Sequence, residues 1–245
     1  MSDPVLVLDR LGKDFAGKAA LAELSCAVRP GEVVGLLGPN GAGKTTTMKL
    51  VLGLLKPTRG TATVHVGGVT LSCTHDARTV KERVGYSPDE PSFYDFLSGR
   101  ETLDFVRNVR GLPPSDDVEA LVTILELGSV LEAPTASYSH GTKKKLALLL
   151  ALAHAPQLLL LDEPTNGLDP PTAARVRRLL RDRAAGGTAV VVSTHLLEMA
   201  DVLCDRMIIL HRGQLIAEGS PADVRVRAGV APTASLEDAF LTLVQ

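Results

Sequence analysis

The stretch that decides the fold is GPNGAGKT, at residues 38–45. It matches the G-x-x-x-x-G-K-[ST] pattern of a phosphate-binding loop over its full length. An apolar run at 33–37 precedes it, predicting a strand, and a periodic stretch at 43–53 predicts a helix directly after it. Glycines let backbone N–H groups turn inward around a phosphate, and the helix N-terminus adds partial positive charge. We therefore predict a phosphate-binding loop here, in preference to a glycine-rich turn before a helix.

The residues of this loop have separate expected roles in binding a nucleotide. Lys44 is expected to neutralise the β- and γ-phosphates and to be part of the catalytic set, and the Thr45 hydroxyl is expected to bind Mg²⁺. The other contacts are expected from the rest of the loop and the residue after it, which are Gly38, Pro39, Asn40, Gly41, Ala42, Gly43 and Thr46. The sequence thus predicts ATP and Mg²⁺ as the bound groups.

A second apolar run, LLLLDEP at 158–164, ends in two carboxylates. Its four leucines are typical of a strand buried on both faces, which brings Asp162 and Glu163 to the strand end. A carboxylate there can hold the shell of Mg²⁺, and a second beside it can orient or deprotonate water. We expect Asp162 to bind magnesium through water and Glu163 to act as the general base. An ordinary acidic turn is the alternative, which the upstream phosphate loop disfavours.

The remaining chain alternates apolar runs with longer periodic stretches, which is typical of an α/β protein. Helices are predicted from 98 to 128, with a break at 111–114. Further short strands are predicted at 61–66, 69–71, 189–193, 207–210 and 214–217. The sequence holds no internal repeat, low-complexity tract or linker, so we expect one domain over residues 1–245.

The composition excludes several classes of protein. The chain has 245 residues, of which 45% are hydrophobic and 22% charged, as expected of a folded protein. The formal net charge of −2 gives no field that draws nucleic acid, so no nucleic-acid partner is expected. Cys26, Cys73 and Cys204 favour a reducing cytosol over a disulfide framework or zinc site. The start of the chain is not a signal peptide, and the apolar region 146–161 is too short and interrupted to span a bilayer.

Together these motifs resemble those of the ATP-binding subunit of ABC transporters, over nearly the whole chain. TNGLDP at 165–170 is similar to the D-loop of that family, with Asp169 at the interface position. The residues at 193–195 are similar to its H-loop, where His195 would contact the γ-phosphate and hold the attacking water. Phe15 lies at the adenine-stacking position, where an aromatic ring accepts any base. The alternative for Phe15 is a core position in a small N-terminal sheet.

The signature motif departs from the family pattern. It is usually LSGGQ and reads YSHGT at 138–142. Ser139 and Gly141 remain at the start of a predicted helix, where a hydroxyl, N–H groups and the helix dipole can bind the γ-phosphate of the opposite subunit. His140 replaces a glycine. The lysine run at 143–145 is either a solvated face or added positive charge near that phosphate.

The Q-loop departs as well, because Asp89 stands where the family usually has Gln. Aspartate is shorter and cannot donate a hydrogen bond when ionised. We still expect it to bind magnesium through water. Four aromatic residues, Tyr86, Phe93, Tyr94 and Phe96, lie close by, and they either anchor a loop to the helical region or line a groove that receives a helix of a membrane subunit.

The resemblance implies a P-loop NTPase fold of the ABC type, with a RecA-like core, an N-terminal antiparallel β-subdomain and an α-helical subdomain. The core and β-subdomain would occupy about 1–86 and 156–220, the helical subdomain about 98–155, and a C-terminal helical tail about 221–245. Two copies, or one copy and a paralogous ATPase subunit, would form a head-to-tail dimer around two ATP-Mg. This dimer would power a separate integral membrane permease from the cytoplasmic, inner face of the cell membrane, with membrane contact only through that permease.

The regions at 85–103 and 236–240 look most like bacterial multidrug and antibiotic exporters with separate ATPase and permease chains. Two other functions remain as alternatives. One is an ABC ATPase outside transport, which would act on DNA or the ribosome, and the other is a regulatory module that binds ATP with slow turnover. The full set of Lys44, Asp162, Glu163 and His195 argues against the second. The transported substrate is not encoded in this chain, because its contacts would lie in the permease.

Overall fold

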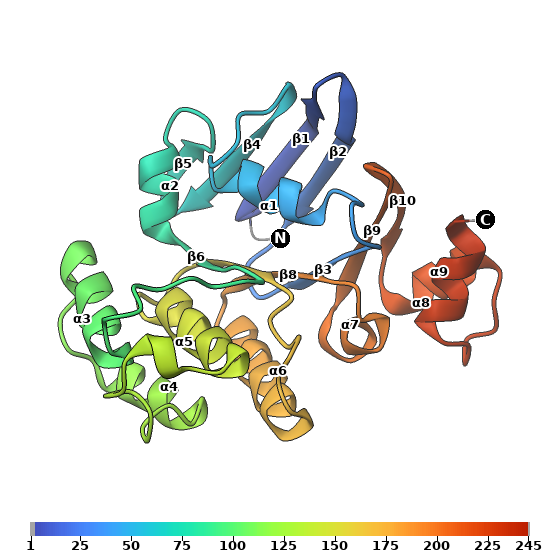
Figure 1. The fold of residues 1–245 in the computed structure, drawn as a ribbon. Helices are drawn as coiled ribbons and strands as arrows, with labels where there is room; N and C mark the ends of the chain where they lie inside the picture. Colours follow the sequence, from blue (N-terminus) through green and yellow to red (C-terminus); the bar gives the residue numbers. More distant parts are fainter. Residues whose placement is uncertain (1–2, 245) are drawn as a thin grey trace.

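The computed structural model describes residues 3–244, in which a six-stranded sheet forms the centre of the molecule (Figure 1). Its strand order is β10-β9-β3-β8-β7-β6. Five of the strands are parallel, and β10 pairs with β9 in the antiparallel direction. The strands are β3 (Val33–Leu37), β6 (Val84–Ser87), β7 (Leu158–Asp162), β8 (Ala189–Thr194), β9 (Arg206–His211) and β10 (Gln214–Gly219).

The central strands are buried on both faces because their side chains alternate between two cores. In β3, Val33 and Leu37 belong to the core on the helical side of the sheet. Val34 and Leu36 belong to the core on the other side. The strands β7 and β8 show the same alternation, which explains why each reads as an unbroken apolar run in the sequence.

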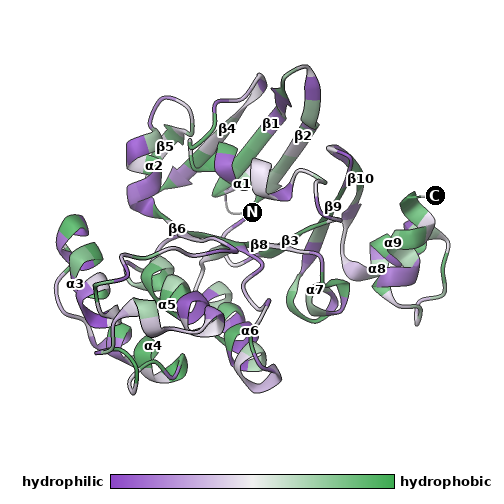
Figure 2. Ribbon diagram, viewed as in Figure 1, coloured by the Kyte–Doolittle hydropathy of each residue, from purple (hydrophilic) through white to green (hydrophobic). Residues whose placement is uncertain are grey.

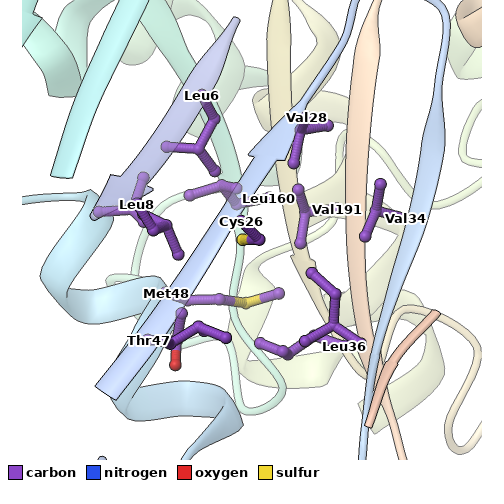
Figure 3. A pocket seen from close by; sticks show the side chains of 13 residues that line it. Leu6, Leu8, Cys26, Val28, Val34, Leu36, Thr47, Met48, Leu160 and Val191 are labelled. Atoms are coloured by element: carbon purple, nitrogen blue, oxygen red, sulfur yellow. The ribbon is translucent and has the colours of Figure 1, made fainter. Parts of the chain in front are cut away.

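A four-stranded antiparallel sheet of order β2-β1-β4-β5 covers one face of the central sheet. The helix α1 (Lys44–Val51) lies between the two sheets (Figure 1). Figure 3 shows a small cavity in this layer, which is lined by Leu8 of β1, Met48 of α1 and Leu36 of β3 among others. Its lining is apolar apart from Thr47, so it is a packing gap and not a site for ATP. The strands are β1 (Leu6–Phe15), β2 (Lys18–Val28), β4 (Arg59–Val66) and β5 (Val69–Ser72).

Helices cover the opposite face of the central sheet (Figure 1). The second half of the helix α5, from Leu146 to Leu152, is an apolar run (Figure 2), and the helix packs against β6. Within residues 3–244, no helix is both long and apolar enough to cross a membrane. These helices are α3 (Gly99–Arg110), α4 (Asp116–Ile124), a 3-10 turn (Thr135–Ser137), α5 (His140–Leu152), α6 (Pro170–Ala185), α7 (Leu197–Leu203), α8 (Pro221–Ala228) and α9 (Leu236–Val244). The helix α2 (Ala77–Arg83) lies instead beside β5, on the side of the antiparallel sheet (Figure 1).

The expected α/β arrangement is present, with differences at several element ends. The helix predicted at 43–53 ends earlier, at Val51, because the chain turns at Gly53 with a φ of 62°. The break predicted at 111–114 is confirmed, because Gly111 ends α3 in a left-handed conformation, whereas the second helix ends at Ile124, before the predicted 128. The helix α2 was not expected. Residues 1, 2 and 245, at the ends of the predicted domain and tail, lie outside the described residues.

Candidate active site

Four loops meet at the carboxyl edge of the central sheet. They follow β3, β6, β7 and β8, which are parallel neighbours or next neighbours in that sheet. Loops at this edge form the usual ligand site of open α/β sheets. The fold therefore brings the phosphate loop, Asp89, the pair Asp162–Glu163 and the residues at 193–195 to one place.

The phosphate loop needs glycine where its backbone approaches other segments. Gly43 has a φ of 108°, and a Cβ added there would lie 2.7 Å from the main-chain oxygen of Ala20. At Gly38, with a φ of 146°, an added Cβ would overlap the main-chain oxygen of Leu210. A side chain at either position would have to displace backbone from β2 or β9. Asn40 and Gly41, at the tip of the loop, are exposed.

The Lys44 side chain folds back over this loop. Its Nζ donates to the main-chain oxygen of Gly38 at 2.6 Å and to that of Pro39 at 3.3 Å. Burial lowers the pKa of Lys44, while the nearby carboxylates of Glu163 and Asp162 oppose that shift. The ammonium thus lies above the loop that would enclose a phosphate.

Two oxygen donors suited to Mg²⁺ lie side by side. The Oγ1 of Thr45 donates to Asp162 Oδ2 at 2.9 Å, and Thr45 is exposed. The second oxygen of Asp162, Oδ1, accepts from the buried hydroxyl of Ser193. Hydroxyl and carboxylate oxygens are the ligands that Mg²⁺ prefers, and it keeps several waters around one or two such groups. The donors present therefore fit a magnesium ion shared with the phosphates of a nucleotide.

The Glu163 carboxylate is held by three donors from the end of β8. Oε2 accepts from Thr194 Oγ1 at 2.9 Å. Oε1 accepts from the main-chain N of His195 at 2.9 Å and lies 2.7 Å from its Nδ1. The side chain is buried, and the residue has a φ of 49°, in the left-handed region that non-glycine residues rarely adopt. Such backbone conformations gather at active sites, where the surroundings fix them.

The Phe15 ring is exposed at 47%, at the end of β1. It belongs to neither core, so the alternative of a core phenylalanine does not hold. The Nζ of Lys13 lies 5.1 Å from the ring centroid. The ring therefore remains accessible for a base to stack on it.

The signature and D-loop residues cap helices. Ser139 is the N-cap of α5 and accepts from the main-chain N of Thr142 at 3.1 Å. Asp169 is the N-cap of α6, and hydrogen bonds from Thr172 lower its pKa. Both are exposed, and in the described part of the chain neither side chain hydrogen-bonds to the phosphate loop. Gly141 lies in the first turn of α5, where an added Cβ would be 3.3 Å from the main-chain oxygen of Gly167.

Asp89 is bound to a side chain that the sequence did not single out by itself. Its Oδ1 accepts from Lys144 Nζ at 2.7 Å. Magnesium binding by Asp89 stays a prediction. Sequence reasoning also missed Ser193 and Thr194, whose hydroxyls donate hydrogen bonds to the carboxylates of Asp162 and Glu163. Their signal was available, because two hydroxyls end the apolar run of β8 just as two carboxylates end that of β7.

Comparison with known proteins gives consistent likenesses. The family model described as ABC transporter matches residues 21–166. The chain is 38% identical over 223 residues to the uncharacterized ABC transporter ATP-binding protein YdbJ of Bacillus subtilis (strain 168), covering 90% of this chain and 70% of that protein. It is also 38% identical over 223 residues to the Nod factor export ATP-binding protein I of Sinorhizobium fredii (strain NBRC 101917 / NGR234), covering 90% and 64%.

A solved structure is similar over nearly the whole chain. It is described as the structure of an ATP binding subunit of an ABC transporter, with a TM-score of 0.90 and 30% sequence identity. The match covers 98% of this chain and 100% of that one.

Proposed function

The chain belongs to the ABC transporter family as an ATP-binding ATPase subunit, and from this premise we propose that it hydrolyses ATP with Glu163 as the general base. Its fold class, an α/β P-loop domain of the ABC type, is confirmed by the same likeness. The observation that carries the proposal is the position of the Glu163 carboxylate. Three hydrogen-bond donors hold it at the end of β7, next in sequence to Asp162, which is hydrogen-bonded to Thr45 of the phosphate loop.

The residues of this chain supply binding and proton transfer. The main-chain N–H groups of the loop and the Lys44 ammonium bind the phosphates, and Phe15 stacks on the adenine. A magnesium ion would be held by Thr45 and, through water, by Asp162, and it would supply positive charge to the phosphates. Glu163 accepts the proton of the attacking water at a carboxylate oxygen. His195 orients that water and the γ-phosphate through the ring nitrogen that does not face Glu163.

We propose that two chains form the complete site. Ser139 and Gly141 stand at the N-terminal turn of α5, and within residues 3–244 the Ser139 side chain hydrogen-bonds to Thr142 and not to the phosphate loop. A helix N-terminus of this kind binds phosphate through free N–H groups and the helix dipole. A head-to-tail pair, either of two identical chains or with a paralogous ATPase, would place each such turn over the other chain's ATP.

The dimer would drive a separate membrane permease from the cytoplasmic face. Exposed aromatic side chains support a docking surface for it, since Tyr94 is 63% and Phe96 is 77% exposed and their ring centroids lie 5.8 Å apart. Aromatic anchors of this kind dominate the energetics of protein interfaces. The export named for the Sinorhizobium relative supports an exporter. The division into a core, a β-subdomain, a helical subdomain and a tail, at the boundaries given above, belongs to the same proposal.

ATP turnover by the full chain tests this function. Glu163→Gln should bind ATP as the wild type does, while kcat falls by about a hundredfold or more. Glu23→Gln, which changes an exposed glutamate of β2 in the same way, should keep wild-type turnover. Retention of full turnover by Glu163→Gln would remove Glu163 as the base. A chain that binds ATP without any turnover would instead favour the regulatory module.

A further inference from the structure

The three lysines at 143–145 have different environments, although the sequence gives them the appearance of one charged face. Lys144 is 3% exposed, while Lys143 and Lys145 are only partly buried. Among the described residues, Lys145 pairs with no carboxylate and makes a long contact of 3.5 Å with the main-chain oxygen of Glu126. A buried ammonium is costly unless it is paired and hydrogen-bonded. The partners of Lys144 should therefore explain its place in the fold.

The Lys144 ammonium joins three segments at the active site. It donates to Asp89 Oδ1 at 2.7 Å and to the main-chain oxygen of Glu163 at 2.6 Å. Asp89 follows β6 by two residues, and Glu163 directly follows β7. These strands are parallel neighbours, with Ser87 paired to Leu161. One side chain from α5 thus bridges the ends of both strands.

We propose that Lys144 is a positioning residue for hydrolysis, which sets the Glu163 backbone and couples it to Asp89 and to the signature turn of α5. The proposal rests on the proposed function, because it takes Glu163 as the base. Lys144 lies in the second turn of α5, and Ser139 caps the same helix. A movement of that turn would therefore be transmitted to Glu163 through one ammonium.

Every polar group of Glu163 has a partner, and its carbonyl accepts from Lys144 Nζ at 2.6 Å and from the main-chain N of Asn166 at 3.2 Å. The main-chain N donates to the Ser193 oxygen at 2.9 Å, and the carboxylate has its three donors from Thr194 and His195. A residue in the left-handed region keeps that conformation only when its surroundings determine it. Removal of Lys144 would leave the carbonyl only the longer hydrogen bond from Asn166, and the peptide after Glu163 would lose its link to α5.

The pair also accounts for an acid at position 89. A glutamine oxygen there would accept the hydrogen bond of Lys144 but would leave its charge uncompensated. The Asp89 side chain is 40% exposed, so it can be rehydrated if Lys144 is lost, whereas Lys144 cannot be rehydrated if Asp89 is lost. Each side chain should therefore contribute to stability only when the other is present. Removal of Asp89, which leaves a buried unpaired ammonium, should cost more free energy of unfolding than removal of Lys144.

Kinetics of matched variants test the proposal. Lys144→Met should lower kcat by about tenfold to a hundredfold, because small displacements of catalytic groups cost that much, with the Kd for ATP changed less than about threefold. Lys144→Gln keeps an amide donor and should recover part of the loss. Lys143→Met and Lys145→Met change the same residue type in the same helix and should leave kcat near the wild-type value.

A double-variant comparison tests the link to Asp89. The loss of kcat in Asp89→Asn/Lys144→Gln should be smaller than the product of the two single losses, because both remove one interaction. In the nucleotide-free protein, the urea midpoint of the double variant should likewise fall by less than the sum of the falls in the two single variants. If Lys144→Met does not fold, Lys144→Gln and Asp89→Asn carry the test, since each keeps a hydrogen-bonding side chain.

Amide hydrogen exchange separates positioning from a general loss of structure. The amides of Glu163, Thr165 and Asn166 should exchange faster in Lys144→Gln and not in Lys143→Met. Equal kcat in the Lys144 and Lys143 variants, or single losses that multiply without coupling, would overturn the proposal. The urea comparison is independent of catalysis, so it still tests the pair if Glu163→Gln keeps its turnover and the base assignment fails.

Discussion

The Glu163 carboxylate and the His195 imidazole are hydrogen-bonded to each other across the ends of two neighbouring strands, with Oε1 2.7 Å from Nδ1. The strands are β7 and β8, whose pairing sets Asp162 opposite Ser193. Because Nδ1 faces Glu163, Nε2 is left for a phosphate oxygen or the attacking water. The base and the γ-phosphate contact of the proposed reaction are therefore oriented by one hydrogen bond.

Thr194 is expected to fix the second oxygen of the base. Its hydroxyl donates to Glu163 Oε2 at 2.9 Å and accepts from the main-chain N of Leu196 at 3.0 Å. Thr194→Val keeps the shape of this fully buried side chain and removes both hydrogen bonds. We expect a loss of about 1–3 kcal/mol in the free energy of unfolding and about a tenfold fall in kcat. Thr194→Ser keeps the hydroxyl and should restore both the free energy of unfolding and kcat. Wild-type kcat in Thr194→Val would show that Oε2 needs no fixed donor.

Phe15 is expected to contribute to ATP affinity and little to stability. Its ring is 47% exposed, so Phe15→Ala should change the free energy of unfolding by less than about 0.5 kcal/mol. Loss of stacking should cost about 1 kcal/mol or more of binding, measured by titration with ATP. Phe15→Trp should bind ATP as the wild type does. Phe105→Ala, at a ring 54% exposed on α3, is the control, and an equal affinity in both alanine variants would exclude stacking by Phe15.

The aromatic residues near the Q-loop separate into two groups. Phe93 and Tyr86 are partly buried against the two cores, whereas Tyr94 and Phe96 are exposed. Tyr94→Ala/Phe96→Ala should therefore keep the ATPase activity of the isolated chain and lose the permease in co-purification. Val226→Ala, an exposed apolar residue of α8, should keep both. Loss of the isolated ATPase activity in the double variant would favour a structural role for these rings.

The sequence predicted those parts of the fold and the site in which one local pattern determines the structure. The strands at 33–37 and 158–162 form over those residues, because apolar runs of this length are buried on both faces. The glycines of the phosphate loop and the carboxylates after β7 follow from the same local patterns. Phe15 could be placed only by resemblance; its exposure excludes the core position, and adenine stacking stays a prediction.

Interactions between distant segments were not predictable in this way. Lys144 is one of three adjacent lysines, and it alone of the three is buried, because β6 and β7 end beneath α5. Its partners are 55 and 19 residues away along the chain. No periodicity in the sequence predicts which of three adjacent lysines meets a carboxylate. The left-handed backbone of Glu163 likewise depends on contacts from β8 and α5.

The oligomeric mass of Glu163→Gln in the presence of Mg²⁺ and ATP tests most directly the central claim that two chains close around ATP and reopen on hydrolysis. Size-exclusion chromatography with light scattering should give a dimer for this variant and a monomer when ATP is omitted. Ser139→Phe added to Glu163→Gln should prevent the dimer, because Ser139 is exposed at the turn that would meet the other chain's phosphate. A Glu163→Gln chain that binds ATP and remains monomeric at every concentration would contradict the shared site.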